Sequence, residues 1–169
     1  FFEEMLSSAS LSFKLYSELS IGAYNCIFHH ADQKIKDKFL PKIVEGKWSG
    51  TMCLTESQCG TDLGLIKTKA VKNEDGSFSL TGQKIFITSG DHDLTENIIH
   101  LVLAKIPGAP QGTKGISLFL VPKFNVNENG SIGSRNGVST LSIETKMGIK
   151  GSPTCVLNFD NAKGYLIGK

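Results

Sequence analysis

The spacing of apolar residues changes near Trp48, and this change constrains the fold more than any other feature of the sequence. Before that residue, apolar side chains recur every three or four positions, beginning with Phe2, Leu6, Ala9 and Phe13. After it, apolar and polar side chains alternate over several short segments. The first spacing places side chains on one face of a helix, and alternation places them on one face of a strand. The chain is therefore predicted to have an α+β fold, with N-terminal helices followed by a mostly antiparallel β-barrel.

The helical part is predicted to cover residues 1 to about 46. Asp32 is a suitable N-cap, because its carboxylate can accept a hydrogen bond from a free amide of the first turn. Pro41 is expected to open a last helical turn at its first position, where proline is tolerated. Gly46 is expected to end the helix, since glycine readily adopts the left-handed conformation found there.

Several short strands are predicted after Trp48, separated by turn signals. They cover residues 51–55, 67–72, 78–88, 98–106, 115–122 and 154–159. Glu74 to Ser77 contains Asp-Gly and predicts a hairpin between the second and third strands. Residues 125–137 are rich in Asn, Gly and Ser and are expected to form a long loop. Many short strands of this kind indicate a small β-barrel or sandwich.

Composition and charge argue against several classes of protein. The 169 residues carry a net charge of +2, so no nucleic-acid partner is expected. No apolar run is long enough to span a membrane. The four cysteines (Cys26, Cys53, Cys59 and Cys155) form no C-x-x-C pair, which predicts buried free thiols rather than a metal site. The sequence opens with Phe1 inside a helical pattern, and we expect the chain to be a piece of a longer protein.

Two segments carry polar groups where strands give way to turns. Residues 52–64 read MCLTESQCGTDLG, an apolar run that ends in a hydroxyl, a carboxylate and a tight turn. Residues 82–90 read GQKIFITSG. Backbone amides and hydroxyls freed at such turns can point at one polar, planar ligand. Taken alone, each segment also suits an ordinary strand and turn, with Gly60 at positive φ and Asp62 capping the turn.

At this separation the two segments resemble the flavin-binding middle domain of acyl-CoA dehydrogenases. Residues 54–56 (LTE) and 60–62 (GTD) stand where the family's first signature requires them, and residues 86–88 (FIT) match its aromatic-Ile-Thr run. Family members often carry Pro at the position of Ser57 and Trp at that of Phe86. Phenylalanine keeps the apolar ring face but loses the indole N–H.

A third segment, residues 146–154 (KMGIKGSPT), resembles the K-M-G-x-R-x-S-x-T run before the last strand of that domain. Leu65 stands where a small residue is usual, a variant similar to the large acyl-CoA dehydrogenases that include the 3-methylmercaptopropionyl-CoA dehydrogenases. The resemblance covers most of the chain. It implies that residues 1–47 end an N-terminal helical domain, that residues 48–169 form the β-barrel middle domain, and that the C-terminal catalytic helical domain is absent.

The resemblance implies FAD-dependent α,β-dehydrogenation of an acyl-CoA thioester by the full-length protein. In that family the base is a glutamate of the C-terminal domain, and no residue of this chain matches it. No catalytic residue is therefore expected here, and the piece alone is expected to hold no FAD and to be inactive. Glu56 is expected to be a structural partner of backbone amides or of a cation rather than the base.

Matched positions imply which residues contact the flavin. Thr88 would bond near the reactive N5 atom, Phe86 would cover one face of the ring system, and Thr61 would also approach the CoA portion of the substrate. The full set of implied flavin contacts is Met52, Leu54, Thr55, Thr61, Phe86, Ile87 and Thr88.

Other interpretations stay open at this level. An acyl-CoA oxidase-like flavoprotein and a non-enzymatic β-barrel that binds an apolar ligand or a partner are the two alternatives. Family analogy implies an electron-transfer flavoprotein as acceptor, a homo-oligomer, and a cytoplasmic (bacterial) or mitochondrial matrix location, with the cytoplasm preferred. His92, between two aspartates, is expected in a surface loop, because adjacent extended positions point to opposite faces and form no triad.

Overall fold

The computed structural model describes residues 1–168 and opens with three helices. These are α1 (Phe2–Ala9), α2 (Leu11–His30) and α3 (Gln33–Val44). Asp32 caps α3 as predicted, because its Oδ1 atom accepts a hydrogen bond from the amide of Ile35 at 2.8 Å. Gly46 follows the helix at φ +70°, also as predicted.

The prediction for Pro41 is wrong. This residue lies inside the continuous helix α3, where it does not open a turn of its own. Its ring removes one backbone donor, which normally weakens a helix. Phe39 and Ile43 on either side of it are buried against the sheet, and this packing holds the helix together across the proline.

Strands make up the rest of the described chain. They are β1 (Trp48–Cys53), β2 (Lys69–Lys72), β3 (Phe78–Thr88), β4 (Asn97–Lys105), β5 (Ile116–Pro122), β6 (Phe124–Val126), β7 (Ile132–Arg135), β8 (Val138–Ile143) and β9 (Thr154–Ile167). Two short 3-10 helices, η1 (Leu63–Leu65) and η2 (Gly112–Gly115), lie in the connections. All six predicted strands are present.

The predicted loop over residues 125–137 is wrong, since β6 and β7 form a small hairpin there. Buried Val126 pairs with Ile132, and only the polar residues between them form the turn. Strand β8 was not predicted, because only its first residue, Val138, is buried and the alternation is weak.

The main sheet is mostly antiparallel, as predicted, and curves until it almost closes. Pairings run β4–β5–β9–β3–β2, and β2 returns to β4 through one parallel pair, Lys69 with Lys105. Strand β1 pairs with β4 in parallel and β8 pairs with β9. Because the closure rests on a single residue pair, barrel is only a loose description of this sheet.

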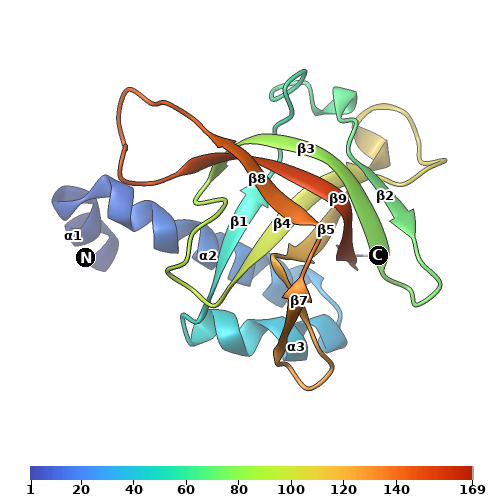
Figure 1. Cartoon of the computed structure of the whole chain (residues 1–169), viewed down its shortest axis with the longest axis horizontal. Helices are drawn as coiled ribbons and strands as arrows, with labels where there is room; N and C mark the ends of the chain where they lie inside the picture. The colour runs from blue at the N-terminus through green and yellow to red at the C-terminus, as the bar shows by residue number, and fades with distance from the viewer. Residues whose placement is uncertain (169) are drawn as a thin grey trace.

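Two cores lie on opposite sides of the curved sheet. One fills its interior, with Leu80, Phe119 and Phe159 among its buried side chains. The other joins the helices to the outer face, around Phe39 and Trp48. Figure 1 shows the helices gathered on one side of the strands.

Helix α2 lies directly on strand β1, and Gly50 allows this close approach. A Cβ atom at that position would clash with the Cβ atom of Ala23. The hydroxyl of Ser20 also accepts a hydrogen bond from the Gly50 amide at 3.0 Å. The strand that leads into the first motif is therefore fixed by the helical layer.

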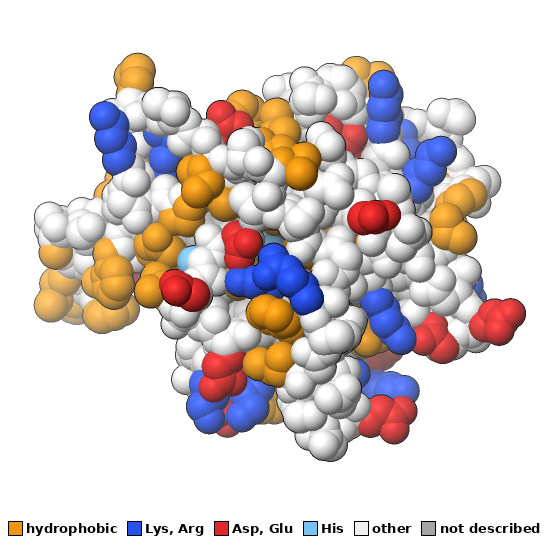
Figure 2. All heavy atoms as spheres, viewed as in Figure 1, with side chains coloured by type: hydrophobic (Ala, Val, Ile, Leu, Met, Phe, Trp, Pro, Cys, Tyr) orange, Lys and Arg blue, Asp and Glu red, His pale blue; other side chains and the backbone are white. Residues whose placement is uncertain are grey.

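The surface over α1 is apolar. Figure 2 shows hydrophobic side chains gathered at this end of the molecule, where Phe1, Phe2, Met5 and Phe13 are exposed. None of the helices within residues 1–168 has the length and apolar character needed to cross a membrane.

Candidate functional site

The two motifs that the sequence singled out lie side by side. The amide of Ile85 in β3 donates a hydrogen bond to the carbonyl oxygen of Thr55 at 2.9 Å. The ammonium of Lys84 reaches the carbonyl oxygen of Leu54 at 3.1 Å. The same ammonium lies 2.8 Å from the carboxylate of Glu56. The end of β1 and the middle of β3 are thus joined by both backbone and side-chain contacts.

Glu56 is a structural hub, as expected from the sequence. Its carboxylate accepts hydrogen bonds from Lys84, from the amide and hydroxyl of Thr68, from the amide of Lys67 and from the Gln58 side chain, at 2.6–3.0 Å. Burial by itself raises the pKa of Glu56, but these hydrogen bonds outweigh burial and lower the pKa to about 2. Burial lowers the pKa of Lys84, and Glu56 opposes that change. With so many donors around it, the carboxylate is ionised at neutral pH.

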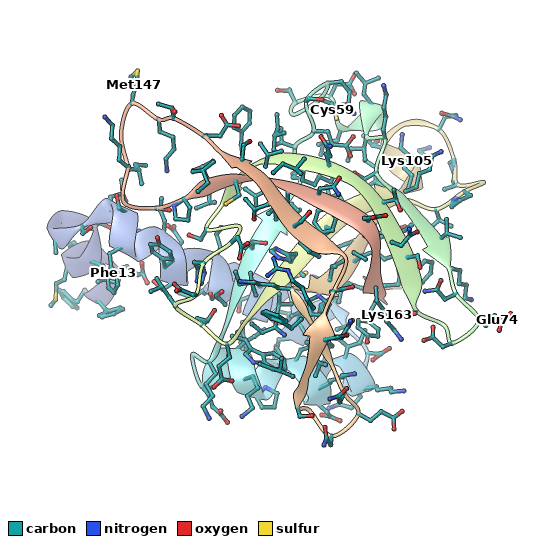
Figure 3. All side chains as sticks on the ribbon, viewed as in Figure 1. Phe13, Cys59, Glu74, Lys105, Met147 and Lys163 are labelled. Atoms are coloured by element: carbon teal, nitrogen blue, oxygen red, sulfur yellow. The ribbon has the colours of Figure 1, made fainter. Side chains whose placement is uncertain are left out.

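The turn after Glu56 presents unused donors. Within residues 1–168, the amides of residues 60–62 and the hydroxyls of Thr55 and Thr61 make no hydrogen bond. Asp62 accepts from the Gly64 amide at 3.1 Å and so caps the turn as expected. Figure 3 marks this turn by Cys59.

Gly60 does not have the positive φ that an ordinary strand and turn would have given it. Its φ is not among the positive values in the chain. The glycine instead allows a close approach, since a Cβ atom there would lie 3.3 Å from the Cγ2 atom of Thr55. The turn therefore folds back against Thr55.

Phe86 points outward because β3 contains a β-bulge. Three steps along β3, from Lys84 to Ile87, face two steps along β9, from Leu157 to Cys155. Strict alternation would place Phe86 on the interior face with Lys84. The extra residue instead leaves Phe86 at φ +59° and 58% exposed, while Ile87 enters the interior core. Positive φ in a bulky residue costs about 1–3 kcal/mol, and strain of this kind clusters at functional sites.

Thr88 connects the second motif to the third. It pairs with Thr154 across β3 and β9, and the next amide, that of Ser89, donates to the carbonyl oxygen of Pro153 at 2.8 Å. The Thr88 hydroxyl makes no hydrogen bond within the described chain. The loop between β8 and β9 also reaches α2, where the Tyr16 hydroxyl donates to the Gly151 carbonyl at 3.0 Å (Figure 1).

We call the surface formed by Thr55, Thr61, Phe86 and Thr88 the open face. The segments that carry these four predicted site residues lie side by side through the Ile85–Thr55 hydrogen bond, and within residues 1–168 their three hydroxyls are unpaired and the Phe86 ring is exposed. The side chains of Met52 and Ile87 are not on it, because Met52 packs toward the helical core and Ile87 is buried inside the sheet.

Sequence reasoning missed Lys84 as a site residue. It occupies a strand position that shares its face with Phe78 and Leu80, so alternation alone places it in the core. A buried lysine requires a carboxylate partner, and this requirement is the signal that could have paired Lys84 with Glu56. Lys105 was missed as well, although its ammonium holds the first motif by donating to the Gly64 carbonyl at 2.6 Å (Figure 3).

His92 lies outside the open face and forms no catalytic arrangement. It is half-buried, with its Nε2 atom 3.3 Å from the Ser49 hydroxyl. Neighbouring Asp91 is bound by Lys123 at 2.6 Å. Cys53, Cys59 and Cys155 are buried free thiols as predicted, and Cys26 is half-buried.

An exposed aromatic ring beside unpaired hydroxyls and amides suits a domain that binds a flat, polar ligand. The comparisons with known proteins specify the class. The family model described as acyl-CoA dehydrogenase, middle domain, matches residues 51–162. The chain belongs to the acyl-CoA dehydrogenase family, and the resemblance inferred from its motifs is confirmed.

Similar proteins support the same assignment. A 3-methylmercaptopropionyl-CoA dehydrogenase of Ruegeria pomeroyi is 46% identical over 98% of this chain and 28% of its own length. A butyryl-CoA dehydrogenase of Syntrophomonas wolfei is 50% identical, with the same two coverages of 98% and 28%. The structure of an acyl-CoA dehydrogenase from Bacillus anthracis complexed with FAD aligns with a TM-score of 0.76 and 30% identity, over 99% of this chain and 26% of that one. The chain thus spans less than a third of these relatives.

Proposed function

We propose that the open face is one wall of the flavin site of an FAD-dependent acyl-CoA dehydrogenase. The observation that carries the proposal is Phe86, a large aromatic side chain held outward at positive φ directly after Ile85, whose amide binds the Thr55 carbonyl oxygen. An exposed ring in a strained backbone has no evident structural use, whereas a flat ring system stacked on it would bury both. Bound FAD would supply the hydride acceptor for oxidation of the acyl chain.

The donors of the open face suit that cofactor. A flavin has ring carbonyls and nitrogens along one edge and a polar chain beyond it. The free amides of residues 60–62 and the hydroxyl of Thr61 are available to such acceptors. The hydroxyls of Thr55 and Thr88 are unpaired within residues 1–168 and are also available, with Thr88 proposed to bond near N5. Leu54, Met52 and Ile87 would contribute backbone rather than side-chain groups.

The proposal assigns different roles to two parts of the chain. Residues 48–169 would form the flavin-facing middle domain and residues 1–47 the end of a helical domain. The base that removes the α-proton would come from outside these 169 residues; Glu56 is not proposed for that role, because every acceptor position of its carboxylate is occupied. Thr61 would also meet the CoA portion of the substrate.

The proposed partners follow from the same assignment. The substrate would be an acyl-CoA thioester, and the electrons would pass to an electron-transfer flavoprotein. The natural gene product would be a homo-oligomer located in the bacterial cytoplasm.

The test uses the natural gene product that carries this chain. We expect it to purify with flavin absorbance, to lose that absorbance when an acyl-CoA is added without oxygen, and to reduce an artificial acceptor dye. A panel of acyl-CoA chain lengths defines the substrate, and peroxide release in air separates an oxidase from a dehydrogenase. Colourless protein, or a bound flavin that no acyl-CoA reduces, would overturn the proposal.

A further inference from the structure

Lys84 contacts two groups of the first motif, not one. Its side chain is fully buried at 0% exposure, and its ammonium donates to Glu56 Oε1 at 2.8 Å and to the Leu54 carbonyl oxygen at 3.1 Å. Leu54 lies one residue beyond the end of β1, so no neighbouring strand pairs with that carbonyl. The lysine is the group that fixes its direction.

The direction of the Leu54 carbonyl decides where the next amide points. In a trans peptide the C=O of one residue and the N–H of the following residue point in opposite directions. Lys84 draws the Leu54 carbonyl toward the interior of the sheet, where its own side chain lies. The N–H of Thr55 is therefore directed outward, toward the open face, and it makes no hydrogen bond within residues 1–168.

The following peptide is held in the same way by a different group. The Thr55 carbonyl accepts the hydrogen bond of the Ile85 amide at 2.9 Å, and the Glu56 amide donates to the Cys59 carbonyl at 2.9 Å. Both ends of that peptide are thus occupied. The Thr55 N–H, by contrast, has no partner within residues 1–168 and is free to meet a ligand.

We infer that Lys84 is a positioning residue, whose buried ammonium orients the Leu54–Thr55 peptide so that the Thr55 N–H donates to the polar edge of the bound flavin. The inference rests on the proposed flavin site. It gives Lys84 a role beyond neutralising Glu56, and the two roles predict different results when contacts of the network are removed singly.

The first test compares Lys84→Met with Thr68→Val in the natural gene product. Both variants remove a donor from the Glu56 carboxylate, since the Thr68 hydroxyl binds Oε1 at 2.6 Å. Only Lys84→Met releases the Leu54 carbonyl. We expect Lys84→Met to weaken FAD binding about two- to tenfold and to shift the flavin absorbance spectrum, as loss of one hydrogen bond predicts. Thr68→Val should leave both unchanged while lowering the unfolding temperature. Equal flavin loss in the two variants, or none in Lys84→Met, would overturn the inference.

A second test needs no variant and covers the case in which Lys84→Met does not fold. Hydrogen exchange is measured on the wild-type gene product with and without FAD. The Thr55 N–H should exchange freely without FAD and become protected with it, whereas the Ile85 N–H should be protected in both. A Thr55 amide already protected without FAD, or unaffected by it, would overturn the inference. A wild-type protein that binds no flavin would overturn the proposed function together with this inference.

Discussion

The carboxylate of Glu56 and the ammonium of Lys84 form a buried ion pair at 2.8 Å that joins the two motifs of the open face. The two residues are 28 positions apart, and their side chains are 4% and 0% exposed. Glu56 ends the run that follows β1, and Lys84 directly precedes the bulge that turns Phe86 outward. The pair thus holds the donor-bearing turn beside the aromatic ring.

Removing one member of the pair is expected to be costly. Lys84→Met leaves Glu56 buried without its cation, and breaking a buried pair in this way typically costs about 3–5 kcal/mol. Urea unfolding of the 169-residue chain measures the loss. Lys69→Met, at an exposed position of the neighbouring strand, serves as the control and should change the free energy of unfolding by less than about 0.5 kcal/mol. Equal stability of both variants would contradict this role of the pair.

The free energy of unfolding is expected to decrease as the pH is lowered below about 6.5. His100 contributes to the first part of this decrease. Burial lowers the pKa of this fully buried imidazole to about 3. Between pH 6.5 and 3 the unfolded chain therefore binds a proton that the folded chain does not. The free energy of unfolding decreases by up to about 1.4 kcal/mol per pH unit in that window.

Glu56 adds to this loss at lower pH. Its folded pKa of about 2 lies below its ordinary value of 4.5, so its stabilisation is complete above 4.5 and is lost as pH falls toward 2. Urea unfolding at a series of pH values measures both effects. His100→Gln should reduce the slope between pH 6.5 and 4.5 and leave the steeper loss below it; the remaining slope in that window is expected from His92, whose pKa burial also lowers. An unchanged slope in this variant would assign the titration to another group.

Phe86→Gly is expected to leave the isolated chain as stable as the wild type, or more stable by up to about 1 kcal/mol. Glycine relieves the strain of positive φ, and an exposed ring loses little burial. Phe78→Ala, a buried ring of the same strand, should instead cost about 3–5 kcal/mol. Thermal unfolding separates the two. A Phe86→Gly variant as unstable as Phe78→Ala would mean that the Phe86 ring is part of the core.

Periodicity predicted the elements of this fold better than their details. The switch at Trp48 and the hairpin around Gly76 followed from spacing and turn residues alone. Strands β6 and β7 are very short, and the polar turn between them dominates the composition of residues 125–137. The sequence therefore predicted a loop there. Pro41 was misplaced because propensity is local, whereas the packing of Phe39 and Ile43 is tertiary.

Prediction of the candidate site from the sequence was limited in the same way. The motif pattern predicted Thr55, Thr61, Phe86 and Thr88 as site residues, and the fold joins the two segments that carry them through the Ile85–Thr55 hydrogen bond. It could not reveal that Ile87 turns inward, because the β-bulge depends on the register between β3 and β9. Such a register is a property of two strands far apart in sequence.

The 169-residue chain alone is expected to hold no FAD when purified, because its affinity for FAD is weak, and to show no dehydrogenase activity. Its open face exposes Phe86 and Thr61, whereas a tight ligand site buries most of its ligand. Titration of FAD into the purified chain, followed by flavin fluorescence, measures the affinity. Stoichiometric tight binding, or acyl-CoA oxidation above a buffer control, would show that the chain completes the site by itself.

The most direct test of the open face as a flavin wall is FAD binding to Thr88→Val in the natural gene product. Valine has nearly the same shape but no hydroxyl, so the change removes one hydrogen bond near N5 and little else. The bond is worth about 0.5–1.5 kcal/mol. We predict up to about tenfold weaker FAD binding or slower flavin reduction by acyl-CoA, with Thr81→Val at the exposed start of the same strand as an unaffected control. Unchanged FAD affinity together with an unchanged reduction rate would contradict the assignment of this face.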